Sequence, residues 1–206
     1  RIRPHRPEAH LFEVVCTVAD PDPAGQVFRL PAWIPGSYMI REFARNIVSL
    51  VAETGGEVVA VTKLDKHTWR TEPVPQGRAL TLTYEVYAWD LSVRAAHLDT
   101  THGFFNGTSV FLEVEGRTDR PCLVEIEKPK GLALCDWRVA TALSPAPEEI
   151  GAASRYGFGL YRASNYDELV DHPVEMGHFT LDSFEAGGIR HDIALTGRHG
   201  CDTDRL

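Results

Sequence analysis

Ala79-Leu-Thr-Leu-Thr-Tyr-Glu-Val-Tyr-Ala-Trp89 is the stretch that decides the fold. Apolar residues occupy every second position, and the other face carries Thr81, Thr83 and Glu85. An alternation of period two is typical of a β-strand with one buried face. The apolar face consists of Leu80, Leu82, Tyr84, Val86 and Ala88. The length of the stretch predicts a central strand of a sheet.

Shorter strand-like segments follow one another along the chain, separated by Gly, Pro, Asn and Asp. We expect strands at residues 11–18, 27–34, 47–53, 58–64, 67–72, 110–114, 122–127, 137–143, 179–184 and 189–195. Helical signals are confined to residues 145–153 and 164–171. This pattern predicts an all-β fold of packed antiparallel sheets, sandwich-like or saddle-shaped, with one or two short helical turns. We expect one β-domain over residues 1–196, because residues 197–206 are polar and unpatterned.

The most irregular stretch is Pro31-Ala-Trp-Ile-Pro-Gly-Ser-Tyr-Met-Ile-Arg-Glu-Phe-Ala-Arg-Asn46. Pro31 and Pro35 lack a donor N–H, so residues 30–34 should lie at a sheet edge, and Pro35-Gly36 suits a tight turn. Two interpretations stay open for residues 38–46. They form a structural corner between sheets, or they face a substrate or another domain.

Composition excludes several classes of partner. The 206 residues carry a formal net charge of −8 with acidic and basic residues interspersed, which argues against nucleic acid or an anionic membrane surface. No apolar run approaches the ~20 residues that a membrane span needs. The sequence leaves a cytoplasmic and a periplasmic location equally open.

The four cysteines form no Cys-x-x-Cys pair, so neither a structural zinc site nor a redox motif is indicated. They are Cys16, Cys122, Cys135 and Cys201. Cys16 and Cys122 lie on the apolar side of strand patterns and are predicted to be small buried residues.

The common catalytic motifs are missing from the sequence. It contains no His-Glu-x-x-His, no Gly-x-Ser-x-Gly and no phosphate-binding glycine loop. His97, Asp99 and His102 could ligate a metal, but polar loop or hairpin contacts explain them as well. Asn106-Gly107 is typical of a hairpin turn.

A second polar segment, residues 161–177, is rich in carboxylates beside aromatic residues. Asp167, Glu168, Asp171 and Glu175 could present an anionic rim to a cationic ligand such as a free amine. The alternative is a capped helical turn with solvated acids, followed by a strand, since carboxylates are stabilised in the first turn of a helix.

Five motifs, in this order, resemble the N-terminal domain of the glycyl aminopeptidase family, metallopeptidase family sixty-one. The first is the irregular stretch from Pro31 to Asn46 quoted above. The others are Lys63-Leu-Asp-Lys-His-Thr-Trp-Arg70, Tyr84-Glu-Val-Tyr-Ala-Trp-Asp-Leu-Ser-Val-Arg94, His102-Gly-Phe-Phe-Asn-Gly-Thr108 and Tyr166-Asp-Glu-Leu-Val-Asp-His-Pro-Val-Glu-Met-Gly177. The resemblance covers nearly the whole chain.

The resemblance implies a saddle-shaped β-domain that precedes a thermolysin-like zinc domain, with a PDZ-like domain further downstream. The family's zinc motif, its general-base glutamate and its Gly-Gly-Leu-Glu-His segment all lie beyond this chain. We therefore assign no catalytic or metal-binding residue here, and expect zinc only in the catalytic domain. By resemblance, residues 197–206 begin the connection to that domain. The parent reaction would release N-terminal amino acids, Gly or Ala, from peptides.

The resemblance also implies a role for this domain. It would wall the active-site cleft, with its own catalytic domain and the substrate N-terminus as partners. In related aminopeptidases a loop of the β-domain reaches the substrate amine. By order along the chain that loop resembles residues 102–108, so His102 and Asn106 are expected to bind substrate. Glu175, from the carboxylate-rich segment described above, is the third expected substrate-binding residue. A simple turn at 102–108 is the alternative.

Two other functions stay open at this point. A free-standing β-sandwich module that binds protein or carbohydrate would need an exposed aromatic platform, for which Trp33, Trp69 and Trp89 are candidates. The alternative is that these tryptophans pack in the core or between sheets. An independent metalloenzyme would use His97, Asp99 and His102.

Overall fold

The computed structural model describes residues 1–34, 36–37, 39–131, 136–202 and 205. Pro35, Tyr38 and Cys135, about which the sequence made predictions, lie outside these ranges. The strands are β1 (Ile2–Arg6), β2 (Leu11–Val18), β3 (Val27–Arg29), β4 (Ile47–Thr54), β5 (Glu57–Val59), β6 (Val61–Lys63), β7 (Thr68–Thr71), β8 (Leu80–Tyr87), β9 (Ala96–Leu98), β10 (His102–Phe105), β11 (Glu113–Val114), β12 (Cys122–Ile126), β13 (Arg138–Thr141), β14 (Ser144–Pro145), β15 (Gly159–Ala163), β16 (Val174–Gly177), β17 (Phe179–Ala186) and β18 (Ile189–Thr196). The helices are α1 (Tyr166–Asp171) and the 3-10 turns η1 (Pro7–Ala9), η2 (Phe43–Asn46) and η3 (Gly107–Ser109).

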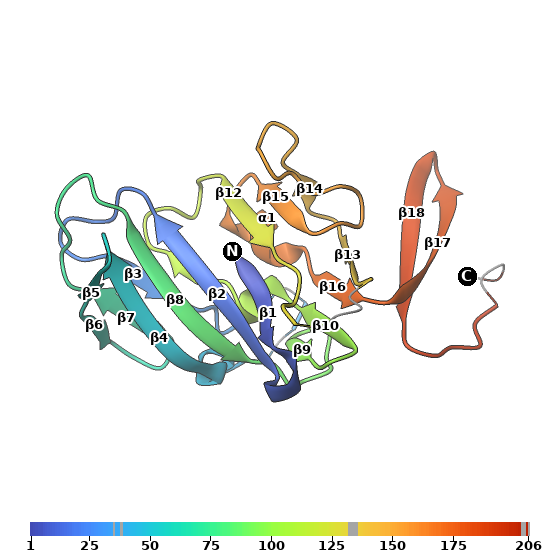
Figure 1. Cartoon of the computed structure of the whole chain (residues 1–206), viewed down its shortest axis with the longest axis horizontal. Helices are drawn as coiled ribbons and strands as arrows, with labels where there is room; N and C mark the ends of the chain where they lie inside the picture. The colour runs from blue at the N-terminus through green and yellow to red at the C-terminus, as the bar shows by residue number, and fades with distance from the viewer. Residues whose placement is uncertain (35, 38, 132–135, 203–204, 206) are drawn as a thin grey trace.

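The strands form four sheets, which confirms the predicted all-β fold (Figure 1). The largest sheet has eight strands in the order β14-β15-β12-β1-β2-β8-β4-β5. Two four-stranded sheets have the orders β13-β16-β10-β9 and β11-β3-β7-β6, and β17 pairs with β18 alone. Strand pairing is antiparallel except between β1 and β12, where Ile2 pairs with Ile126 in parallel.

β8 lies inside the large sheet, as its sequence pattern predicts, with β2 on one side and β4 on the other. Its alternating apolar side chains are almost fully buried. They enter one core that residues of all three larger sheets share, because Phe28 of β3 and Phe105 of β10 belong to the same cluster. Phe12 of β2 meets Phe105 edge to face at 5.7 Å between ring centroids.

Two predicted elements are wrong, because tertiary contacts occupy their backbone groups. Residues 110–114 form a strand only at β11. Upstream of β11 the hydroxyl of Tyr84 donates to the Val110 carbonyl and accepts from the Leu112 N–H. Residues 145–153 form turns instead of a helix, since the N–H groups of Ala146 and Ala153 both donate to the Leu160 carbonyl.

Other predicted elements have different bounds. Residues 58–64 divide at Ala60 into β5 and β6, which belong to different sheets. The predicted strand 27–34 stops at Arg29 inside its sheet rather than at an edge. Strands β1, β9, β10, β14 and β15 were not predicted, whereas α1 and the β17–β18 hairpin were.

The β17–β18 hairpin extends away from the other sheets at the far end of the molecule (Figure 1). The Arg138 side chain holds its base by donating to the Phe179 carbonyl, and Tyr156 donates to Asp192 at 2.6 Å. In the described part of the chain, no helix is long and apolar enough to cross a membrane.

Candidate functional site

The four-stranded sheet β13-β16-β10-β9 has one apolar and one polar face. Phe105, Val174 and Met176 are fully buried in the core. Because side chains alternate between the faces of a strand, His102, Phe104 and Asn106 follow one another on the opposite face. Register places Glu175 of β16 and His97 of β9 beside Phe104 on that face. The sheet thus brings all three predicted substrate-binding residues, His102, Asn106 and Glu175, to one surface, which we call the outer face.

Glu175 lies at the centre of the outer face. It pairs with Phe104 on one side and with Ala140 of β13 on the other. Burial raises the pKa of Glu175 to about 7, and the nearby Asp99 contributes to the rise. The Thr196 hydroxyl donates to its Oε1 at 2.8 Å, which opposes that rise. Glu175 is therefore a carboxylate that titrates near neutral pH, with no Lys or Arg of the described residues in ion-pair contact.

The turn from β9 to β10 is built around Asp99. Its Oδ1 accepts from the N–H and the hydroxyl of Thr101, each at 2.6 Å, and from the His102 N–H at 3.0 Å. Burial alone would raise the pKa of Asp99, but these hydrogen bonds hold it well below its usual range. Burial lowers the pKa of the His102 imidazole, and His97 adds to that effect while Asp99 opposes it. At neutral pH this turn therefore carries an ionised Asp99 beside a neutral His102.

His97, Asp99 and His102 each offer a ligand atom within 4.8 Å of the others, a group that could hold a metal ion. However, both Asp99 oxygens already have donors. His97 Nε2 lies 3.3 Å from Oδ2 and must carry the proton, because a carboxylate only accepts. His97 Nδ1 has no partner among the described residues. The hydrogen bonds to both Asp99 oxygens fit the capped turn that the sequence leaves open as the alternative to a metal site.

Four rings form a continuous stack beside this turn. Trp89 lies between His10 and His97, at 3.9 and 4.9 Å between ring centroids, and His97 stacks on His102 at 4.8 Å. His10 donates from Nδ1 to the Leu98 carbonyl at 2.7 Å. The sequence analysis missed the role of Trp89 and His10, since residues so far apart along the chain give no local signal. The alternation of His102, Phe104 and Asn106 was a signal that could have revealed Phe104.

Asn106 does not form the predicted hairpin turn. It precedes η3 as the N-cap residue, and its Oδ1 accepts from the N–H of Thr108 at 3.1 Å and from the Thr108 hydroxyl at 2.6 Å. The chain therefore turns into η3 rather than into an adjacent strand. Two hydrogen bonds already occupy its side-chain oxygen, and the amide nitrogen remains available as a donor.

The acidic residues of the segment 161–177 do not form one rim. Asn165 caps α1 through the Glu168 N–H at 2.8 Å. Hydrogen bonds from Ser164 lower the pKa of Glu168. Asp167 lies in the same first turn. Asp171 is the last residue of the helix, and it is exposed to solvent. Of the predicted rim, only Glu175 is placed on the outer face.

The three tryptophans do not share one environment. Trp33 and Trp89 are 53% and 54% exposed, whereas Trp69 is 6% exposed and carries Lys63 over its ring. Core packing is therefore right for Trp69, and Trp89 packs between His10 and His97, whereas neither core burial nor a ring contact is recorded for Trp33 among the described residues. In the irregular stretch, Met39 and Ile40 are also exposed, and the Ser37 N–H donates to the Ile34 carbonyl at 3.2 Å.

Comparison with known proteins identifies the family. The family model for the peptidase M61 N-terminal domain matches residues 1–178. The crystal structure of an aminopeptidase N family protein from Idiomarina loihiensis is similar, with 42% sequence identity and a TM-score of 0.90. That similarity covers 99% of this chain and 33% of the relative, so this chain spans about a third of its length.

A second solved structure, Legionella pneumophila aminopeptidase A in complex with aspartic acid, has 11% identity and a TM-score of 0.46. It covers 94% of this chain and 22% of that protein, and the likeness is too weak to support an argument. No curated protein sequence matches significantly. The family model and the Idiomarina structure together show that this chain belongs to the peptidase M61 family, as its N-terminal domain.

Proposed function

We propose that this chain is the non-catalytic N-terminal domain of a zinc aminopeptidase, where it walls the active-site cleft and orients the substrate N-terminus. Family membership supports the peptidase class. The observation that carries the proposal is the outer face, where a carboxylate, an imidazole and an amide surround Phe104. The partners would be the chain's own catalytic domain and a peptide with a free amine, and the residue released would be Gly or Ala.

Glu175 is the group best suited to the amine. An ionised carboxylate accepts from an ammonium through a charge-assisted hydrogen bond. Glu175 has no cationic partner of its own among the described residues, and an ammonium beside it would lower its raised pKa. Binding of an amine would therefore strengthen as the pH rises through about 7 and Glu175 ionises.

His102 and Asn106 would contact other parts of the peptide. His102 begins β10 and Asn106 follows its last residue, so their Cα atoms are separated by roughly 13 Å at the rise of an extended strand. One ammonium cannot reach both. Glu175 pairs with Phe104, midway between them, so the two residues flank the proposed amine site on either side. The free amide N–H groups of Asn106 suit a peptide carbonyl.

The chemistry itself would come from elsewhere. When zinc is bound in the catalytic domain, it activates a water for attack on the scissile carbonyl. The 206 residues contain no His-Glu-x-x-His motif, and the hydrogen bonds at Asp99 fit a capped turn. The contribution of this chain is to position the substrate.

The test is Glu175→Gln in the full-length enzyme. We expect KM for alanyl and glycyl amide substrates to rise about tenfold with a much smaller change in kcat, because one charge-assisted contact is lost. Inhibition by alaninamide should weaken equally, whereas inhibition by propionamide, which lacks the amine, should not change. Glu53→Gln, an exposed glutamate on β4, is the matched control. Equal losses for alaninamide and propionamide would contradict the proposal.

A further inference from the structure

A row of side chains crosses the outer face from Glu175 to Trp89. Glu175 of β16 pairs with Phe104 of β10, and Phe104 pairs with His97 of β9. Trp89, just beyond the end of β8, pairs with His97 in an isolated antiparallel bridge. Because residues directly opposite one another in a sheet point to the same face, these four side chains lie in one line. We call Glu175, Phe104, His97 and Trp89 the outer row.

Trp89 is an exposed side chain that its neighbours hold in place. It is more than half exposed, yet His10 and His97 stack against it at 3.9 and 4.9 Å between ring centroids. His10 is itself fixed, because its Nδ1 donates to the Leu98 carbonyl. A ring that is already ordered loses little freedom when a ligand packs on it. The exposed part of Trp89 is therefore a preformed contact surface for an apolar group.

The β17–β18 hairpin occupies the other side of Glu175. The Thr196 hydroxyl, at the end of β18, donates to the Glu175 carboxylate, and Arg138 of β13 donates to the Phe179 carbonyl at the base of the hairpin. Figure 1 shows the hairpin on the β13 side of this sheet, with β9 farther from it. A peptide whose amine lies at Glu175 would therefore extend the other way, across β10 and β9.

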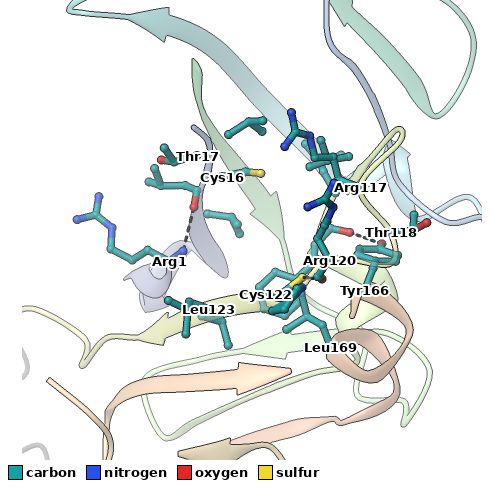
Figure 2. Close-up of a pocket in the computed structure, with 18 of the residues that line it drawn as sticks. Arg1, Cys16, Thr17, Arg117, Thr118, Arg120, Cys122, Leu123, Tyr166 and Leu169 are labelled. Atoms are coloured by element: carbon teal, nitrogen blue, oxygen red, sulfur yellow. Dashed lines mark hydrogen bonds between the residues drawn. The ribbon is translucent and has the colours of Figure 1, made fainter. Parts of the chain in front are cut away.

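The cavity shown in Figure 2 lies elsewhere in the molecule. It has a volume of about 750 Å³, and its lining includes Cys16, Cys122, Tyr166 and Leu169. Among the described residues, no member of the outer row lines this cavity. A peptide on the outer face would therefore place its side chains against exposed rings rather than in the cavity.

The spacing of the strands determines which substrate residue meets Trp89. Neighbouring strands are about 4.8 Å apart, so the three steps of the outer row separate Glu175 from Trp89 by roughly 14 Å. An extended peptide rises about 3.3 Å per residue. With its amine at Glu175, its second residue would lie over Phe104 and its fourth would lie near Trp89. The second and fourth side chains point to the same side of an extended peptide, so both can face the sheet.

We propose that Trp89 forms a specificity subsite for the side chain of the fourth residue of a peptide substrate. This subsite rests on the function proposed above, since Glu175 is taken as the amine site. Aromatic side chains are preferred there, because rings that meet edge to face or offset gain more than the burial of apolar area alone. The favoured substrates are therefore peptides of four or more residues with an aromatic residue at the fourth position.

Hydrolysis of two matched tetrapeptide amides by the full-length enzyme tests this subsite. The substrates are Ala-Gly-Ala-Phe-amide and Ala-Gly-Ala-Ser-amide, and release of the N-terminal alanine is measured. We expect kcat/KM to be about tenfold higher for the first peptide than for the second, and Trp89→Ala should abolish most of this preference. A ratio of the two values cancels any general loss of activity in the variant. Equal kcat/KM values in the parent enzyme, or an unchanged ratio in Trp89→Ala, would overturn the proposal.

Three further variants isolate the contribution of Trp89. Trp33→Ala removes a similarly exposed tryptophan outside the outer row and should leave the ratio unchanged. Trp89→Phe keeps an aromatic ring and should retain most of the preference. Glu175→Gln should slow both tetrapeptides by the same factor, so failure of the amine site and failure of the Trp89 subsite are distinguishable.

A third peptide tests the register. Ala-Gly-Phe-Ala-amide carries its aromatic residue at the third position, where an extended peptide points the side chain away from the sheet. We expect this peptide to be hydrolysed no faster than Ala-Gly-Ala-Ser-amide. A preference at the third position equal to that at the fourth would contradict the assigned subsite.

Discussion

At the scale of single residues, Glu175 determines how the molecule responds to pH. Its pKa is about 7 in the folded chain and near 4.5 when unfolded. Below pH 4.5 both states are protonated. Between pH 4.5 and 7 the unfolded chain loses this proton first, so the contribution of Glu175 to stability declines as the pH rises. Glu175→Gln should therefore be more stable than the parent at pH 8 by up to about 3 kcal/mol, roughly 6–12 °C in Tm, and should unfold at the same temperature as the parent at pH 4.

Thermal unfolding followed by circular dichroism at several pH values measures this difference. The Thr196 hydroxyl can still donate to the Gln oxygen, so the variant keeps that contact. Glu53→Gln, exposed on β4, should follow the parent at every pH. A Glu175→Gln variant that is less stable than the parent at pH 8 would show that the carboxylate has an unrecognised favourable partner.

At the scale of elements, long strands could be predicted from the sequence and short ones could not. β8 and β2 carry enough alternation to identify them, and α1 has a capping residue. β9 and β10 are three and four residues long and contain His and Gly, so their pairing depends on partners distant in sequence. The outer face was missed as a unit for this reason. His102 and Asn106 were predicted through family resemblance and Glu175 as one carboxylate of the segment 161–177, because no pattern in the sequence predicts that β16 lies beside β10.

The contact of η3 with α1 depends on Gly107. A Cβ at this position would lie 2.6 Å from the Val170 Cα and 3.1 Å from the Leu169 carbonyl oxygen. Because both are backbone atoms, the helix itself would have to move. Gly107→Ala should destabilise the chain by about 1–3 kcal/mol in urea unfolding. Gly200→Ala, with nothing within 4 Å of the new Cβ, is the control, and equal midpoints for both variants would contradict the packing described.

At the scale of the whole molecule, the chain corresponds to the N-terminal domain of the peptidase M61 family. It spans a third of the Idiomarina relative, and the family match ends at residue 178, immediately before β17. The following hairpin leaves Phe184 and Ile189 exposed, and an isolated two-stranded hairpin is marginal in water. We therefore expect the hairpin to contact the catalytic domain proposed above.

The 206-residue chain should not hydrolyse alanyl or glycyl chromogenic amides, with or without added zinc. The full-length protein should hydrolyse both, because the proposed catalytic zinc site lies outside this domain. Assays of both proteins at equal molar concentration test this prediction. The metal content of each protein is measured in parallel. Zinc-dependent activity in the 206-residue chain would transfer the catalytic role to His97, Asp99 and His102.

The parallel pair β1–β12 has a consequence for biosynthesis. Ile2 meets Ile126 only after the ribosome has made everything between them, which takes roughly 6–25 s at common elongation rates. β1 can pair with β2 soon after both emerge, but its other edge stays open during this time. A nascent chain with an open apolar edge is a target for chaperones and for aggregation. Slow elongation before codon 126 should therefore lower the yield of folded protein more than slow elongation after it.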